Sequence, residues 1–160
     1  MKTMEDLFLH LLKDIYYAEK QILRALPKMA KKAETPELKQ AFAHHRDETE
    51  GQVQRLESVF ELMDKAARGE KCDAILGLIE ESKEVMEEGQ TAEVIDAGLL
   101  AGAQAVEHYE IARYGTMVAM AEQLGMTDAM QLLQQNLNEE KKTDELLTRL
   151  AKSTVNRKAA

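Results

Sequence analysis

Acidic side chains interrupt four apolar stripes that otherwise repeat every three or four residues, the spacing of one helix face. Pairs that lie three residues apart, such as Glu107 and Glu110, fall on the same side of a helix. Burying an ionised carboxylate without a partner is strongly unfavourable, so four interrupted stripes indicate a shared cause. The interrupting residues are Glu19 in the first stripe, His45 and Glu48 in the second, Glu107 and Glu110 in the third, and Glu140 and Asp144 in the fourth.

Metal binding is the chemistry that this residue set favours. A buried cluster of this charge persists only if cations neutralise it. Carboxylate oxygens combined with imidazole suit iron, manganese or zinc, and two divalent ions offset about four negative charges. We therefore expect these seven residues to surround two metal ions, with His45 either a ligand or a core residue beside the ligands. The alternative is that some of the acids lie on helix edges and pair with Arg or Lys.

Periodicity and capping residues predict the helices that carry these side chains. Four long helices are expected over about 4–33, 36–67, 91–125 and 127–152, with a shorter amphipathic helix within 70–90. Thr3 is a candidate N-cap of the first helix, and Thr35 with Pro36 marks the start of the second. Gly69 is expected to stop the second helix, and Gly125 the helix that begins near Thr91.

The connections between these helices predict the topology. Helices one and two, and the last two long helices, are joined by only a few residues, which makes antiparallel hairpins. About 25 residues separate the second long helix from the third, far more than a hairpin needs. The fold class predicted is all-α, a ferritin-like four-helix bundle with a long crossover that contains a short extra helix. We expect one domain over residues 1–155 and a frayed tail over 156–160.

The position of the acids along their helices tests whether they meet. Glu19 and Glu48 lie 15 and 14 residues from Glu34, in the middle of the first turn. Glu110 and Glu140 each lie 15 residues from Gly125 in the second turn. At a rise of about 1.5 Å per residue, all four stand roughly 21–23 Å from their own turns. The acids of each hairpin therefore share one level, and facing hairpins would bring them into a single layer.

Composition excludes several other classes of protein. The chain has 29 acidic and 21 basic residues, a formal charge of −8 that disfavours nucleic-acid or anionic-membrane partners. One cysteine, Cys72, excludes an internal disulfide and suits a reducing compartment. No apolar run approaches the roughly 18–20 residues of a membrane helix, and no signal peptide is recognised. We therefore expect a cytoplasmic protein without membrane or nucleic-acid partners.

Five segments of the chain resemble the YciF family of bacterial stress-associated, ferritin-like proteins: IYYAEKQILRALPKMAK, HHRDETEGQVQRLE, GLIEESKEV, VEHYEIARYGT and LNEEKKTDELL. The similarity covers nearly the whole chain and keeps order and spacing. It implies a bundle close to that of rubrerythrin and a homodimer. In rubrerythrin the third helix carries two Glu ligands three apart, which Glu107 and Glu110 match. Glu19, Glu48 and Glu140 match the single Glu ligands of the other three helices.

The sequence departs from ferritin-like oxidases at two positions. Gly51 and Thr143 stand where a Glu-x-x-His pattern would place His on the second and fourth long helices. The site is thus rich in carboxylate and poor in imidazole. The chain also lacks a Cys-x-x-Cys pair, so any reductant must be an external electron donor.

These observations support a dimetal-carboxylate protein, with iron first and manganese or zinc next, that acts on peroxide or oxygen during stress as an oxidase or peroxidase. The alternative is a non-catalytic dimeric stress or interaction module with a vestigial metal site. Iron storage ranks last, because the chain shows no clear fifth C-terminal helix after residue 152.

Overall fold

The computed structural model describes residues 1–160 as helices joined by short loops, with no strand. The five main helices are α1 (Met4–Lys32), α2 (Pro36–Leu62), α3 (Asp73–Glu88), α4 (Ala92–Gln123) and α5 (Thr127–Leu150). A π-helical segment (Ala151–Val155) and α6 (Asn156–Ala159) follow α5. No helix combines the length and the apolar character that crossing a bilayer requires.

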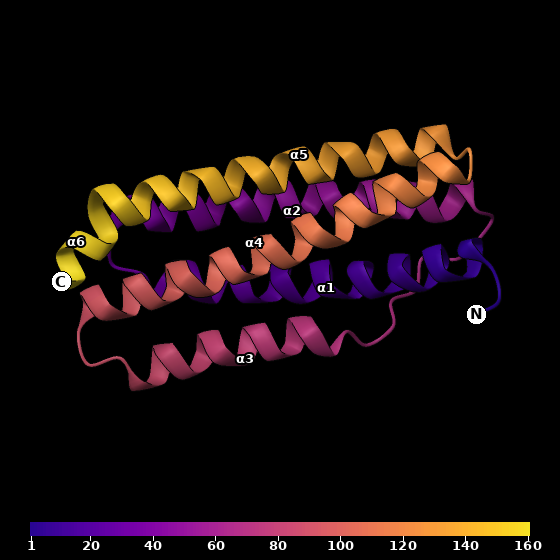
Figure 1. The fold of residues 1–160 in the computed structure, drawn as a ribbon. Helices are drawn as coiled ribbons and strands as arrows, with labels where there is room; N and C mark the ends of the chain where they lie inside the picture. Colours follow the sequence, from indigo (N-terminus) through magenta and orange to yellow (C-terminus); the bar gives the residue numbers. More distant parts are fainter.

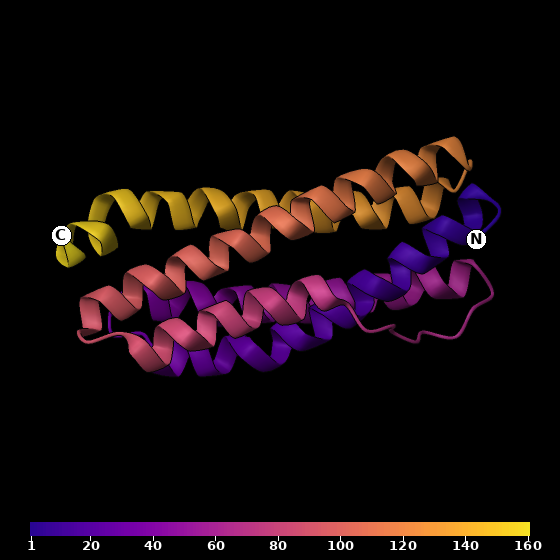
Figure 2. The same cartoon turned by 60° about the horizontal axis from the view of Figure 1, so that its bottom comes forward.

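Two antiparallel hairpins, α1–α2 and α4–α5, form the four-helix bundle, as Figure 1 shows. Their turns lie at opposite ends of the bundle, and the crossover that contains α3 makes α2 and α4 run parallel (Figure 1). This confirms the predicted ferritin-like arrangement. In Figure 2 the α4–α5 hairpin lies above the α1–α2 hairpin, and α3 packs along α1 and α4.

Local sequence signals explain most of the helix ends. Thr3 forms a capping box with Asp6: the Thr3 hydroxyl accepts from the Asp6 amide at 3.1 Å, and the Asp6 carboxylate accepts from the Thr3 amide. Thr91 caps α4 by accepting from the Val94 amide at 3.3 Å. Gly125 adopts φ +69° in the α4–α5 turn, a conformation that glycine reaches without a steric penalty.

The predicted end of α2 near residue 67 is wrong, because the helix ends at Leu62. Asp64 adopts φ 54°, and its amide donates to the Glu61 carbonyl at 3.0 Å. The Lys65 amide donates to the Phe60 carbonyl, also at 3.0 Å, which completes a Schellman motif. Aspartate tolerates the left-handed conformation better than most residues. Asp64 therefore ends the helix five residues before Gly69, the expected stop.

The first turn is held by a residue from the other hairpin. The Thr35 side chain makes no capping hydrogen bond, contrary to expectation. Instead the Asp96 carboxylate accepts from the Glu34 amide at 2.8 Å and from the Thr35 amide at 2.7 Å. Asp96 is 2% exposed, so this contact fixes α4 against the α1–α2 turn inside the protein.

The crossover helix α3 approaches α4 closely because α4 carries glycine where the two touch. A Cβ atom built on Gly98 would collide with Val85, and one built on Gly102 would collide with Ser82. At the other end of the chain, Val155 is buried, whereas α6 has no buried residue. The expected fraying of residues 156–160 stays a prediction.

Candidate metal centre

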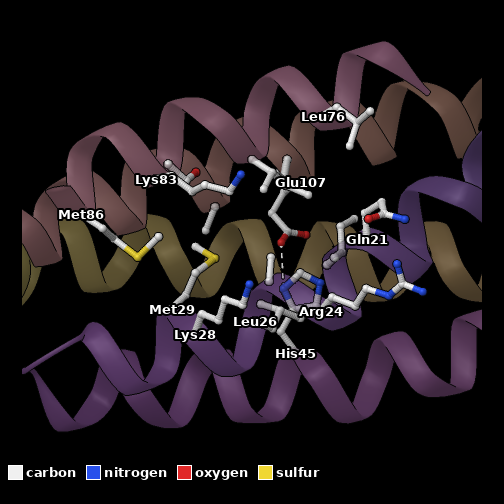
Figure 3. A pocket seen from close by; sticks show the side chains of 16 residues that line it. Gln21, Arg24, Leu26, Lys28, Met29, His45, Leu76, Lys83, Met86 and Glu107 are labelled. Carbon is white, nitrogen blue, oxygen red and sulfur yellow. Dashed lines mark ion pairs between the residues drawn. The ribbon is translucent and has the colours of Figure 1, made fainter. Parts of the chain in front are cut away.

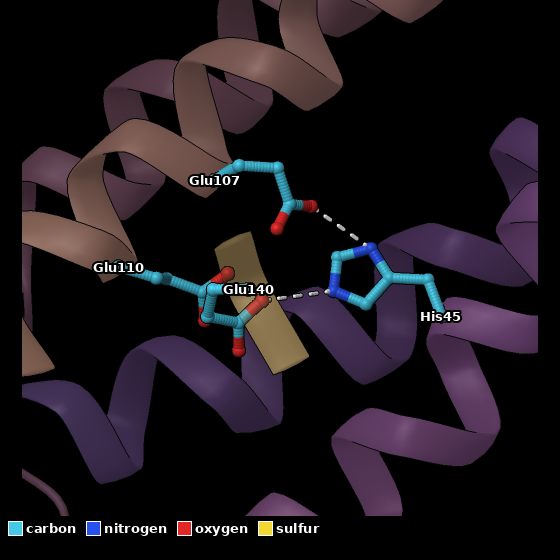
Figure 4. A group of neighbouring side chains, drawn as sticks. All are labelled: His45, Glu107, Glu110 and Glu140. Carbon is cyan, nitrogen blue, oxygen red and sulfur yellow. Dashed lines mark ion pairs between the residues drawn. The ribbon is translucent and has the colours of Figure 1, made fainter. Parts of the chain in front are cut away.

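One histidine and three glutamates from three helices meet inside the bundle (Figure 4). His45 comes from α2, Glu107 and Glu110 from adjacent turns of α4, and Glu140 from α5. One ligand atom from each of the four lies within 4.8 Å of the others. The three glutamates are 0% exposed and His45 is 3% exposed, so water does not solvate their charges.

His45 faces a carboxylate with each of its ring nitrogens. Its Nδ1 lies 3.0 Å from Glu107 Oε1, and its Nε2 lies 3.7 Å from Glu140 Oε2 (Figure 4). Neither contact is a hydrogen bond: Glu107 Oε1, Glu140 Oε2 and His45 Nε2 all lack a hydrogen-bond partner, and 3.7 Å is too long for one. The histidine therefore leaves the lone pairs of the carboxylates unoccupied.

Seven buried carboxylate oxygens have no hydrogen-bond partner: both oxygens of Glu107, Glu110 and Glu140, and Oε2 of Glu19. Buried polar atoms in folded proteins nearly always have a partner, so a concentration of exceptions at one place calls for an explanation. Oxygen ligands aimed at a common point, with one imidazole, are the donor set of a divalent transition metal. The residues present therefore fit a metal site.

Burial and mutual repulsion disturb the titration of these acids. Burial raises the pKa of Glu107 to about 8, and the charge of Glu19 adds to the shift. Burial, followed by the charges of Glu140 and Glu19, raises the pKa of Glu110 well above its usual value. The pKa of Glu140 rises for the same reasons, with Glu107 as its main charged neighbour. Without cations, the cluster can lower its charge only by holding protons.

Glu19 of α1 lies next to this group and is held by a hydrogen-bonded chain. Its Oε1 accepts a hydrogen bond from the Tyr114 hydroxyl, which in turn accepts from Asn136 Nδ2 at 3.0 Å. Burial raises the pKa of Glu19 to about 7, while the bond from Tyr114 lowers it. The chain leaves Glu19 Oε2 without a partner, so α1 adds one more free oxygen to the buried layer.

Glu48 and Asp144 point to other partners. Glu48 is partly buried, accepts from the Thr143 hydroxyl at 3.2 Å and lies 3.4 Å from His44 Nε2. Asp144 accepts from Gln104 at 3.2 Å and lies 3.2 Å from His108 Nε2. Thr143 stands where the Glu-x-x-His pattern of ferritin-like oxidases would place a histidine. Its hydrogen bond holds Glu48 at the edge of the group. Of the seven predicted residues, four meet, Glu19 adjoins them, and two lie outside.

Two residues that support the site, Tyr114 and Asn136, were not among the predicted site residues. Asn136 is 0% exposed and interrupts the apolar positions Leu133 and Leu137 on α5. A buried amide on an apolar stripe is the signal that could have identified it, because such a group needs hydrogen-bond partners inside the fold.

Comparison with known proteins supports the family resemblance. The model of the family described as "Domain of unknown function (DUF892)" matches residues 3–160. The chain is 52% identical to protein YciF of Escherichia coli (strain K12) over 160 residues, which cover 99% of this chain and 96% of YciF.

Solved structures agree with the fold. The crystal structure of the E. coli stress protein YciF matches with a TM-score of 0.93 and 52% identity, over 98% of this chain and 99% of that one. YcfI from Rhodopseudomonas palustris matches with a TM-score of 0.90 and 50% identity, over 92% and 94% of the two chains. A protein from Xanthomonas campestris pv. campestris has the same fold, with a TM-score of 0.76 and 24% identity over 96% and 94%. The chain therefore belongs to the DUF892 family and is a relative of YciF.

Proposed function

We propose that this protein binds two divalent metal ions, iron in the first place, in the buried carboxylate layer and acts on peroxide or oxygen under stress. The observation that carries the proposal is the set of seven partnerless carboxylate oxygens around His45. The stress context is that of the relative YciF, which is described as a stress protein. Manganese and zinc suit the same ligands and are the next candidates.

The residues that would hold the metals are Glu19, His45, Glu107, Glu110 and Glu140, with Glu48 and Asp144 within reach of a small rearrangement. Bound iron would supply Lewis acidity and electrons for reducing peroxide or oxygen. The chain itself orients the ligands: Tyr114 fixes one oxygen of Glu19, and Asn136 fixes the Tyr114 hydroxyl. The low exposure of the layer excludes bulk water, which strengthens each charge interaction inside it. An external donor would return the electrons.

Metal uptake is the decisive experiment. The protein, purified without chelator, is expected to retain metal, and the chelated protein to take up close to two ferrous or manganous ions per chain. Glu110→Gln should lose most of this capacity, whereas Glu122→Gln, an exposed acid on the same helix, should bind like the unaltered protein. Elemental analysis and calorimetric titration measure both, and peroxide consumption under a reductant tests the reaction. A chain that holds no metal and refuses iron would overturn the proposal.

The second candidate is a non-catalytic interaction module, and one observation favours it. Glu48 and Asp144 already have protein partners, so the group that lacks partners is smaller than the seven residues predicted. Such a module would need the dimer for its function, and its function would survive substitution of the metal-ligand residues. Light scattering tests the homodimer that the family resemblance implies. If Glu110→Gln leaves stress survival intact while changes that dissociate the dimer abolish it, the interaction module is correct.

A further inference from the structure

A cavity of about 230 Å³ opens between α1, α3 and α4 and ends at the buried site. Its inner end is formed by His45 and Glu107, two members of the group described above (Figure 3). The volume exceeds the ~150 Å³ of an engineered apolar cavity that takes up benzene, so a small organic molecule has room. The cavity therefore connects the surface to one edge of the carboxylate layer.

The wall between the mouth and the inner end is apolar. Nine of the sixteen lining residues are hydrophobic, and they come from all three helices. They include Ile22 and Leu26 of α1, Ile79 and Met86 of α3, and Ala103 and Val106 of α4. The crossover helix thus covers the cavity and contributes side chains to its wall. A ligand that fills this space gains from burying an aliphatic or aromatic body.

The mouth carries three cations in a chain whose formal charge is −8. Arg24 and Lys28 lie one turn apart on α1, and Lys83 lies on α3 across from them (Figure 3). All three are exposed, and neither Arg24 nor Lys28 has an acidic partner within 4.0 Å. Lys83 pairs at 2.6 Å with exposed Glu80, and Glu107, at the far end, is the single acid of the lining. Arg24 and Lys28 are therefore the cations at the mouth that are free to pair with an anion.

We propose that this cavity binds a small organic anion with an apolar body, an aliphatic carboxylate of medium length. Its carboxylate pairs with the cations at the mouth, and its chain lies along the apolar wall with the far end directed at His45 and Glu107. A small inorganic anion would make no contact with the apolar wall, and a neutral hydrocarbon would form no ion pair with the cations at the mouth. The role of the cavity as a substrate site rests on the proposed function, but binding of the anion itself needs no metal.

Octanoate is the probe. Octanol is the control that lacks the charge, and acetate is the control that lacks the aliphatic chain. Titration calorimetry on the full chain, with and without manganous ion, is expected to show octanoate binding at least about tenfold more tightly than either control. Octanoate that binds no more tightly than acetate would overturn the proposal.

Two variants locate the binding site. The triple variant Arg24→Gln, Lys28→Gln, Lys83→Gln should weaken octanoate binding by about tenfold or more, as loss of charge pairing predicts. The triple variant Lys39→Gln, Lys65→Gln, Lys152→Gln makes the same change in net charge with exposed residues outside the cavity and should bind octanoate normally. Equal weakening in both would show a nonspecific charge effect and exclude the cavity.

Ala25→Leu narrows the cavity from α1 and should also weaken binding, whereas Ala112→Leu, at an exposed position of α4, should not. Octanoate binding unaffected by the narrowing and by the charge variant would place the ligand elsewhere. The metal titration separates the two proposals. A chain that binds octanoate in the cavity but takes up no metal overturns the proposed function alone, and a chain that binds metal but no octanoate overturns this inference alone.

Discussion

Two buried carboxylates on the same helix, Asp96 and Glu110, have opposite surroundings. Asp96 is 2% exposed, and each of its oxygens accepts from a backbone amide, at 2.8 and 2.7 Å. Glu110 is 0% exposed, and neither of its oxygens has a hydrogen-bond partner. Both oxygens of Asp96 have hydrogen-bond partners in the protein, so this carboxylate stabilises the fold. Neither oxygen of Glu110 is satisfied by the chain, as the proposed metal site requires of its ligands.

Removing the Asp96 carboxylate should have the largest effect on the free energy of unfolding. Asp96→Ala leaves the Glu34 and Thr35 amides without acceptors, and each lost hydrogen bond to a charged group costs about 1.5–3 kcal/mol. We expect a loss of about 3 kcal/mol in the free energy of unfolding, measured by urea titration. Asp96→Asn, which keeps one acceptor oxygen, should lose less. An unchanged unfolding midpoint for Asp96→Ala would remove the structural role of this contact.

Removing the Glu110 carboxylate should not lower the free energy of unfolding of the metal-free protein. Glu110→Gln keeps the shape of the side chain and removes a group whose charge its neighbours repel, so urea titration in chelator should show equal or higher stability. With ferrous or manganous ion, the unaltered chain should gain several degrees in melting temperature and the variant little, because only binding to the folded state stabilises it. If Glu110→Gln lost as much stability as Asp96→Ala, Glu110 would be a structural carboxylate like Asp96.

The metal-free protein should lose stability as the pH rises. The pKa of a free glutamate is about 4.3 in the unfolded chain, whereas the pKa values of Glu19 and Glu107 in the fold are about 7 and about 8. Between pH 5 and 8 the folded state therefore binds more protons than the unfolded state, and the free energy of unfolding falls. Urea titrations at several pH values in chelator measure this slope. Saturating metal should flatten it, and a rise in stability over this range would contradict the raised pKa values.

Tyr114 tests the chain that orients Glu19. Tyr114→Phe removes a hydroxyl that donates to Glu19 and accepts from Asn136, so we expect a loss of about 1–2 kcal/mol in the free energy of unfolding. Removing a group that orients a ligand typically lowers metal affinity by about 10–100-fold, which calorimetry can detect. Tyr17→Phe, at a partly buried tyrosine without a side-chain hydrogen bond, is the control. Equal effects of the two variants would assign Tyr114 to packing alone.

Thr143 should give the smallest effect. Thr143→Val keeps the shape of the side chain and removes its hydrogen bond to Glu48, a contact worth about 0.5–1 kcal/mol. If the bond also restrains Glu48 from joining the ligands, metal affinity in the variant rises or stays unchanged. A fall in affinity beyond that of Tyr114→Phe would instead place Thr143 among the groups that support the ligands.

Much of the fold follows from features within each helix. The lengths of the two short links predicted the hairpins, and the long link predicted that α2 and α4 run parallel. Capping at Thr3 was predicted from the preference of threonine for the N-cap position, and the structure confirms it. The end of α2 was not predicted, because a left-handed aspartate can end a helix as glycine does and leaves a weaker signal.

The sequence by itself determined the height of each acid along the bundle, because the rise per residue of a helix is fixed. That is why Glu19, Glu48, Glu110 and Glu140 were expected in one layer. Which acids face one another was decided only by the tertiary structure, since helix rotation and crossing depend on how side chains pack. Packing turned Glu48 toward Thr143, brought Asp96 to the opposite hairpin and placed α3 over a cavity that no periodicity within a single helix could reveal.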